Sequence, residues 1–193
     1  MGEARTGGEA ALSGVTAELD AALRHAAAQA PGSAAFAELL DSLHVHVGAG
    51  KLIRPRLVEL GWRLATADPV PPSGRAAVDR LGAAFELLHT ALLVHDDVID
   101  GDDLRRGAPS TPGRFHADAL RVGAPAAAAR SFATAGAILT GDLALGAAMR
   151  AVASAPVPRE RMLQLLDLFD HTLSVSAAGE LADVRLSLGC EEP

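Results

Sequence analysis

The segment from Glu86 to Gly107 constrains the fold of this chain more than any other. It overlaps a largely apolar stretch, Ala83 to Asp100, without glycine or proline, which predicts a helix ending near Gly101. At about 100° per residue, an arc of roughly 100° on one face of this helix collects its polar residues. These are Glu86, His89, Asp96, Asp97 and Asp100, together with Leu93. A polar stripe therefore crosses an otherwise buried helix.

The carboxylates at the end of this helix, Asp96, Asp97 and Asp100, would repel one another. Two unit charges about 4 Å apart interact by about 4 kcal/mol at an effective dielectric constant near 20. Divalent cations, magnesium above all, would relieve the repulsion and keep positions open for water or phosphate. Arg105 and Arg106 follow and suit bidentate contacts with phosphate oxygens. These residues predict a magnesium and diphosphate site; taken alone, the acidic residues also fit a solvated helix end before a charged loop.

A second basic segment, Gly48 to Pro55, reads GAGKLIRP. Its glycines let backbone N–H groups approach an anion, and a helix beginning at Pro55 offers partial positive charge. Lys51 and Arg54 add full charges, so the segment is a candidate phosphate cradle; the alternative is a basic loop between two helices. It is not a P-loop, because Leu52 stands where that motif needs serine or threonine.

The acidic stretch resembles the first aspartate-rich motif of the trans-isoprenyl diphosphate synthases, the polyprenyl synthetase family: DDxxD, followed after four residues by RRG. Gly50 to Pro55 resembles the GGKxxRP motif of the family, with Ala49 replacing its first glycine or the glycine pair displaced by one residue. Two later segments resemble the GDxLL and GQxxD motifs: Gly141–Leu145, and Gly179–Asp183 with Glu180 replacing glutamine. The alternative for Gly141–Leu145 is ordinary helix packing, and the alternative for Gly179–Asp183 is a solvated acidic face.

The resemblance implies a role for each motif residue. Magnesium would bind Asp96, Asp97 and Asp100, which with Arg105 form the catalytic set and hold the allylic diphosphate. The diphosphate of isopentenyl diphosphate would contact Lys51, Arg54, His89 and Arg106. In the family, the fifth residue before the first aspartate often limits product length. Here it is the small Ala91, followed by Leu92, which favours a product longer than farnesyl, such as geranylgeranyl.

The activity implied by the resemblance is prenyl transfer in isoprenoid biosynthesis, in which isopentenyl diphosphate condenses with an allylic diphosphate. Two alternatives share these residues: a non-catalytic partner subunit of a prenyl diphosphate synthase and a class I terpene cyclase. Lys51, Arg54 and Arg106 disfavour the cyclase, which has no isopentenyl diphosphate to hold. The pair His95 and Asp96 also occurs in HD phosphohydrolases, but His116 and His171 lack a supporting local pattern.

The composition favours an all-α protein, because apolar residues make up 49% of the 193 residues, aromatic residues only 3%, and tyrosine is absent. The net charge of −7 argues against nucleic acid as the main partner. The single cysteine, Cys190, excludes an internal disulfide. Neither a signal peptide nor an apolar run of transmembrane length is recognised, so a soluble cytoplasmic protein is the default expectation.

Residues 1–8 are expected to form a flexible tail, and residues 9–193 an incomplete helical domain. The resemblance implies an antiparallel bundle of the isoprenoid synthase type that lacks its C-terminal helices and forms a homodimer. Because the second aspartate-rich motif is not reached before Pro193, a fragment or a short relative is expected. The expected helices are Glu9–Ala30, Ser33–Val47, Pro55–Thr66, Ala83–Asp100, Arg114–Arg121, Ala126–Ala153 and Arg159–Ser187, and residues 108–113 are expected to be loop.

Overall fold

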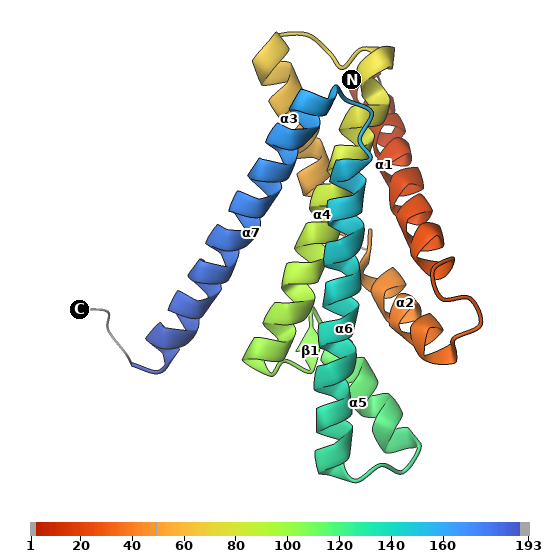
Figure 1. Cartoon of the computed structure of the whole chain (residues 1–193), viewed down its shortest axis with the longest axis vertical. Coiled ribbons are helices and arrows are strands. Elements are labelled where there is room, and N and C mark those ends of the chain that lie inside the picture. The colour runs from red at the N-terminus through yellow and green to blue at the C-terminus, as the bar shows by residue number, and fades with distance from the viewer. Residues whose placement is uncertain (1–2, 49, 190–193) are drawn as a thin grey trace. The chain divides into compact units, whose positions relative to one another are not determined.

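The computed structural model of the chain describes residues 3–48 and 50–189 and is almost entirely helical, which confirms the predicted all-α class. The elements in order are α1 (Glu3–Ala27), α2 (Ala34–His46), α3 (Ile53–Thr66), α4 (Pro72–Asp100), β1 (Leu104–Arg105), β2 (Ala108–Pro109), α5 (Thr111–Arg121), α6 (Ala126–Ala153) and α7 (Arg159–Ser187) (Figure 1). The chain divides after Ala155 into two compact units, and α7 belongs to the second.

The core of the first unit lies between α4 and α6, which run side by side over much of their lengths (Figure 1). Along α6, five alanines at helical spacing are fully buried: Ala129, Ala133, Ala137, Ala144 and Ala148. Such small side chains allow a close approach of helices. A Cβ atom on Gly136 would lie 2.7 Å from the ring of Phe115, and one on Gly141 would overlap His95. The expectation that small residues near Gly141 serve helix packing is therefore confirmed.

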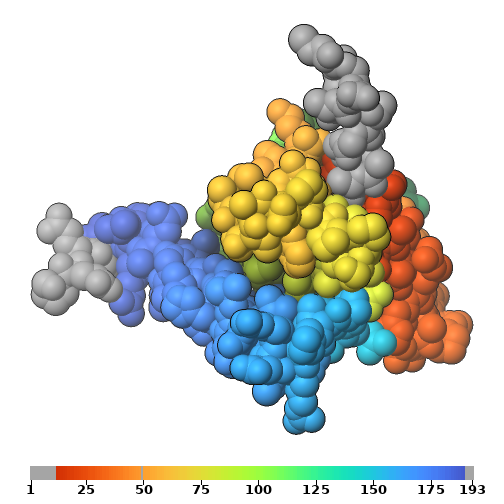
Figure 2. All heavy atoms as spheres, turned by 90° about the horizontal axis from the view of Figure 1, so that it is seen from above, coloured from red at the N-terminus to blue at the C-terminus, as the bar shows by residue number. Residues whose placement is uncertain are grey.

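Helices α1 and α3 pack on α4, and α5 packs on α6. Figure 2 shows the end of α3 and the first turns of α4 next to each other on one surface of this unit. Trp62 is half-buried there, with its ring 3.2 Å from the position of a Cβ atom on Gly74. Trp62 therefore packs against the first turn of α4.

Several helix ends lie where capping residues predict them. The side chain of Ser33 accepts a hydrogen bond from the backbone N–H of Phe36 at 3.2 Å and so begins α2. At the other end of the acidic helix, Gly101 has a φ of 70°, the left-handed conformation that ends many helices. The acidic motif is therefore fixed in the last turn of α4.

Other boundaries differ from the expectations. α4 begins at Pro72, since proline is tolerated in a first turn, and α3 begins at Ile53, two residues before Pro55. α5 begins at Thr111, and a short hairpin occupies part of the expected loop. α1 begins at Glu3, whereas the first helix was expected to begin at Glu9. Residues 1–2, Ala49 and residues 190–193 lie outside the described residues.

The expectation that no apolar run approaches transmembrane length needs correction. α6 is long and apolar enough to cross a membrane, judged by its length and composition alone. Core helices of soluble proteins pass the same test, and α6 packs along α4 and α5 within the first unit. This packing accounts for part of its apolar character, since 39% of the apolar window is buried.

Candidate active site

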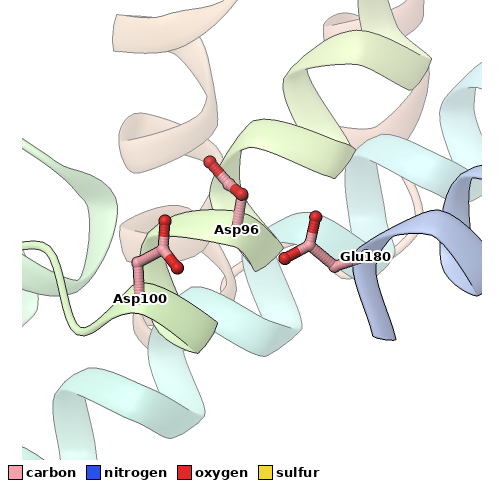
Figure 3. Close-up of side chains that lie close together, drawn as sticks. All are labelled: Asp96, Asp100 and Glu180. Atoms are coloured by element: carbon pink, nitrogen blue, oxygen red, sulfur yellow. The ribbon is translucent and has the colours of Figure 1, made fainter. Parts of the chain in front are cut away.

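The last turn of α4 carries the three aspartates in two different environments. Asp96 and Asp100 are one turn apart and lie next to each other at the surface of the helix, with carboxylate oxygens within 4.8 Å (Figure 3). Asp97 is only 2% exposed. Burial raises the pKa of Asp97, and the hydrogen bond from Arg105 offsets only part of this effect. The accessible oxygen ligands of this helix are therefore those of Asp96 and Asp100.

Arg105 joins the two neighbouring aspartates. Its Nε donates to Oδ1 of Asp97 at 2.5 Å, and its Nη2 donates to Oδ2 of Asp96 at 2.7 Å. Sequence reasoning placed Arg105 near a substrate diphosphate but did not anticipate that it would neutralise the aspartates. The fork-shaped guanidinium suits such a bridge, because its donors can reach two carboxylates at once.

Arg105 and Arg106 are carried by a two-stranded hairpin in which Leu104 pairs with Pro109 and Arg105 with Ala108. The strands are joined by Arg106 and Gly107, whose φ angles are 54° and 79°. Positive φ at both central residues is characteristic of a tight type I′ hairpin turn. Gly107 adopts this conformation easily, whereas Arg106 is held in a region that side chains other than glycine rarely occupy. The turn thus fixes Arg106 at the exposed tip.

Cationic residues from separate elements meet around His89. The pKa of His89 is lowered to about 4, by burial first and then by the positive charges of Arg54, Arg106 and Arg105. Arg54 comes from the first turn of α3, His89 from the middle of α4, and the other two from the hairpin. Lys51 lies exposed just before α3. The structure thus brings together the arginines and the histidine that the sequence assigned to one anion site.

Glu86 lies one turn before His89 and is 6% exposed. Its Oε2 atom has no hydrogen-bond partner among the described residues, and a Cβ atom on Gly50 would lie 4.0 Å from its Oε1. Burial raises the pKa of Glu86, and the charge of Arg54 opposes this shift. Sequence reasoning placed Glu86 on the polar stripe but gave it no role; its position three residues before His89 was the available signal.

Within the first unit, the two histidines of the HD phosphohydrolase alternative, His95 and His116, each lie near a different aspartate. His95 lies 3.4 Å from a carboxylate oxygen of Asp142, and His116 lies 3.9 Å from one of Asp103. His171 belongs to α7 in the second unit. Each histidine has its own surroundings, so the structure favours the diphosphate site over the phosphohydrolase alternative.

Ala91 is 1% exposed and packs with Leu43 and Ala144, while Leu92 is half-buried. Leu143 packs against the same cluster and also lines a cavity of about 500 Å³ between α1, α4 and α6. Small residues supply much of the apolar lining of this cavity: Ala21, Ala22, Ala26, Ala83, Gly146, Ala147 and Ala151. The lining also includes charged side chains, among them Glu18, Arg80, Asp142 and Arg150.

The residues at the end of α4 fit a magnesium ion by their chemistry. Asp96 and Asp100 offer hard, accessible carboxylate oxygens. These oxygens lie within 4.8 Å of each other, close enough to bind the same ion. Glu180, which the sequence singled out in the fourth motif, is a half-buried residue of the second unit. The first unit by itself supplies the two accessible carboxylates.

Comparison with known proteins places these features in context. The family model described as polyprenyl synthetase matches residues 37–191. The chain is 29% identical over 146 residues to the geranylgeranyl diphosphate synthase of Sulfolobus acidocaldarius, an alignment that covers 75% of this chain and 37% of the relative. It is 30% identical to the octaprenyl diphosphate synthase of Escherichia coli, over 75% of this chain and 36% of the relative.

A solved structure shows the same similarity. The geranylgeranyl pyrophosphate synthase of Corynebacterium glutamicum, complexed with isoprenyl diphosphate and magnesium, superposes with a TM-score of 0.78 at 25% identity. The match covers 96% of this chain and 51% of that one. The chain therefore spans between about a third and a half of the length of these relatives.

Proposed function

Because the chain belongs to the polyprenyl synthetase family, we propose that it is the diphosphate-binding part of a trans-prenyltransferase that condenses isopentenyl diphosphate with an allylic diphosphate. The main support for the proposal is the arrangement of charged residues around His89 and the end of α4. Arg54 and Arg106, from two separate elements, both lower the pKa of His89 through their charges, and Arg105, next to Arg106 in the hairpin, pairs with Asp96 and Asp97 at the end of α4. Cations that can grip phosphate and carboxylates that can hold magnesium are thereby combined in one place.

In this proposal Asp96 and Asp100 hold magnesium, with Asp97 behind them. Magnesium supplies positive charge for the diphosphate that leaves the allylic substrate. Arg105, which already contacts Asp96 and Asp97, lies beside this position and adds a second fixed charge. Stabilising the charge that grows on a leaving group is the main contribution such a site can make.

The diphosphate of isopentenyl diphosphate is proposed to contact Lys51, Arg54, His89 and Arg106. With a pKa of about 4, His89 is neutral at pH 7 and can donate one N–H to a phosphate oxygen. The arginines supply the charge. The apolar surroundings of Ala91 limit access of water to the carbocation that the allylic substrate forms.

Product length is proposed to depend on Ala91 and Leu92. A small side chain at Ala91 supports a product longer than farnesyl. We expect Ala91→Phe, introduced into the complete enzyme, to shift products towards shorter chains, because the ring fills the path along α4. Chromatography of the labelled prenyl products measures this, and an unchanged length distribution contradicts the assignment.

Assembly and location are also proposals. The family resemblance implies a homodimer, and exposed apolar residues on α6, among them Ile138, Leu139 and Met149, support an interface there. Sedimentation velocity of the wild type and of Leu139→Lys tests it. A soluble, cytoplasmic location is proposed on the same resemblance.

The central experiment measures binding of magnesium and pyrophosphate to this chain by calorimetry and by thermal unfolding. A ligand at 100 times its dissociation constant stabilises a folded protein by about 2.7 kcal/mol. We expect such stabilisation in the wild type, its loss in Asp96→Ala, and no loss in Asp118→Asn, which alters an exposed ion pair on α5. Turnover of farnesyl diphosphate with labelled isopentenyl diphosphate then tests catalysis. Absence of binding by the wild type would overturn the proposal.

A further inference from the structure

The hairpin that carries Arg105 and Arg106 is attached at its root by backbone hydrogen bonds. The N–H of Asp102 donates to the carbonyl of Asp97 at 2.9 Å, and the N–H of Ser110 donates to the carbonyl of Asp103 at 3.0 Å. Ser110, which is fully buried, also donates through its hydroxyl to the carbonyl of Asp102. These bonds fix the ends of the hairpin to α4 and to the first turn of α5.

Asp103 adds an attachment of another kind, from the side chain. Its Oδ1 accepts a hydrogen bond from Nη1 of Arg130 at 2.7 Å, and its Oδ2 accepts one from Nη2 at 3.2 Å. His116 of α5 lies 3.9 Å from the same carboxylate. Arg130 belongs to α6, so this bidentate pair links the hairpin root to a helix 27 positions away in the sequence.

The pair is too exposed to serve mainly as a source of stability. The side chains of Asp103 and Arg130 are 41% and 52% exposed, and ion pairs of this kind contribute little to folding. Their geometry is more informative. Two parallel N–H···O bonds define both the distance and the orientation of the groups they join. Asp103 directly precedes β1, so a change in its position would also move Leu104 and Arg105.

We propose that Asp103 is a positioning residue: held by Arg130, it sets the orientation of the hairpin so that Arg105 reaches Asp96 and Asp97 while Arg106 faces the anion site. The inference rests on the proposed function, since it concerns the same diphosphate site. Hydrogen bonds of 2.5 and 2.7 Å leave little tolerance for a displaced hairpin. Asp103 itself is proposed to contact neither substrate nor metal.

The first readout is the Nε–H of Arg105, followed by ¹⁵N NMR in the chain without ligand. Because this group donates to the buried Asp97, its exchange with solvent should be slow in the wild type. We expect Asp103→Asn and Arg130→Gln to speed this exchange, because a less firmly held hairpin exposes the group to solvent more often. The melting temperature should change by no more than about 4 °C, since the pair is exposed.

The second readout is the affinity for magnesium pyrophosphate, which should fall about tenfold in Asp103→Asn. The exchanged pair Asp103→Arg with Arg130→Asp should recover most of that loss and slow the Nε–H exchange again. The matched control is Asp118→Asn, which removes an exposed carboxylate from the ion pair with Arg121 elsewhere on α5. Neither readout should change in this control.

The outcomes separate the two proposals. If the wild type binds magnesium pyrophosphate and Asp103→Asn changes neither readout, Asp103 has no positioning role and the inference is overturned. If the wild type does not bind, the proposed function fails, while the exchange of the Arg105 Nε–H still decides whether Asp103 orients the hairpin. If the Arg105 Nε–H exchanges faster in Asp103→Asn but is not slowed again in the double variant Asp103→Arg with Arg130→Asp, the role assigned to Arg130 is contradicted.

Discussion

His89 is the residue whose titration differs most clearly from its ordinary behaviour, since burial and nearby arginines lower its pKa from 6.5 to about 4. In the unfolded chain it binds a proton near pH 6.5, whereas the folded chain resists that proton down to about pH 4. The free energy of unfolding should therefore fall as the pH drops through this window. At about 1.4 kcal/mol per pKa unit, the loss amounts to at most about 3.5 kcal/mol.

Urea unfolding at a series of pH values measures this effect. We expect His89→Gln to remove much of the loss between pH 6.5 and pH 4, and the exposed His44→Gln to leave it unchanged. An identical acid dependence in wild type and His89→Gln would show that other groups carry it.

For Glu86 we expect the opposite dependence of folding stability on pH. Because burial raises its pKa, the folded chain holds a proton above the ordinary range, and stability falls as the pH rises from about 4.5. Glu86→Gln removes this cost, so we expect it to stabilise the chain by about 1–2 kcal/mol at pH 8 and by less at pH 5. Urea unfolding at the two pH values decides, and an equal gain at both would contradict the interpretation.

For single residues, the sequence predicted which side chains belong to the candidate site but not which residues they contact. The spacing of Asp96, Asp97 and Asp100 indicated a metal site, yet helical periodicity could not show that Asp97 is buried against Arg105. That contact depends on the path of the hairpin. Similarly, the convergence of Arg54 with His89 depends on how α3 packs on α4, which local pattern does not determine.

Among the elements, α6 offers the sharpest test of packing, through two of its glycines. A methyl group on Gly136 would meet the ring of Phe115 at 2.7 Å, whereas one on Gly146 would meet nothing within 4 Å. We expect Gly136→Ala to destabilise the chain by about 1–3 kcal/mol, since overpacking forces neighbours to move. Gly146→Ala should stabilise it by up to about 1 kcal/mol through helix propensity.

Chemical denaturation of the two variants measures the difference, and each serves as the control for the other. Similar effects of both substitutions would show that α6 is not held close to α5 at Gly136. The comparison needs no ligand, so it tests the fold independently of the proposed function.

Helices were predicted well from the sequence because their signals are local. Ser33, Gly101 and the apolar spacing along α6 act within a few residues. The hairpin was missed because its strands are two residues long and include Pro109, which was interpreted as a loop signal. Only the positive φ of Arg106 and Gly107 closes it, and an arginine is an unusual residue for that conformation.

For the whole molecule, the sequence predicted the class and the family but not the division of the chain. The all-α composition and the polyprenyl synthetase motifs are confirmed by the helical fold and by the family match over residues 37–191. The boundary after Ala155 was not anticipated, although Pro156 and Pro158 interrupt the helices there. Proline predicts a break between helices but gives no indication of how many contacts cross it.

The bridge formed by Arg105 has a consequence for the whole molecule: the acidic end of α4 carries its own counterion. Because Arg105 already compensates Asp96 and Asp97, we expect the chain to fold without metal. We expect a chelator to leave the melting temperature of the wild type unchanged and to lower that of Arg105→Gln, whose aspartates lack compensation. A metal-dependent wild type would contradict this. Folding and metal supply are then uncoupled, so newly made chains reach the native state whatever the local magnesium concentration.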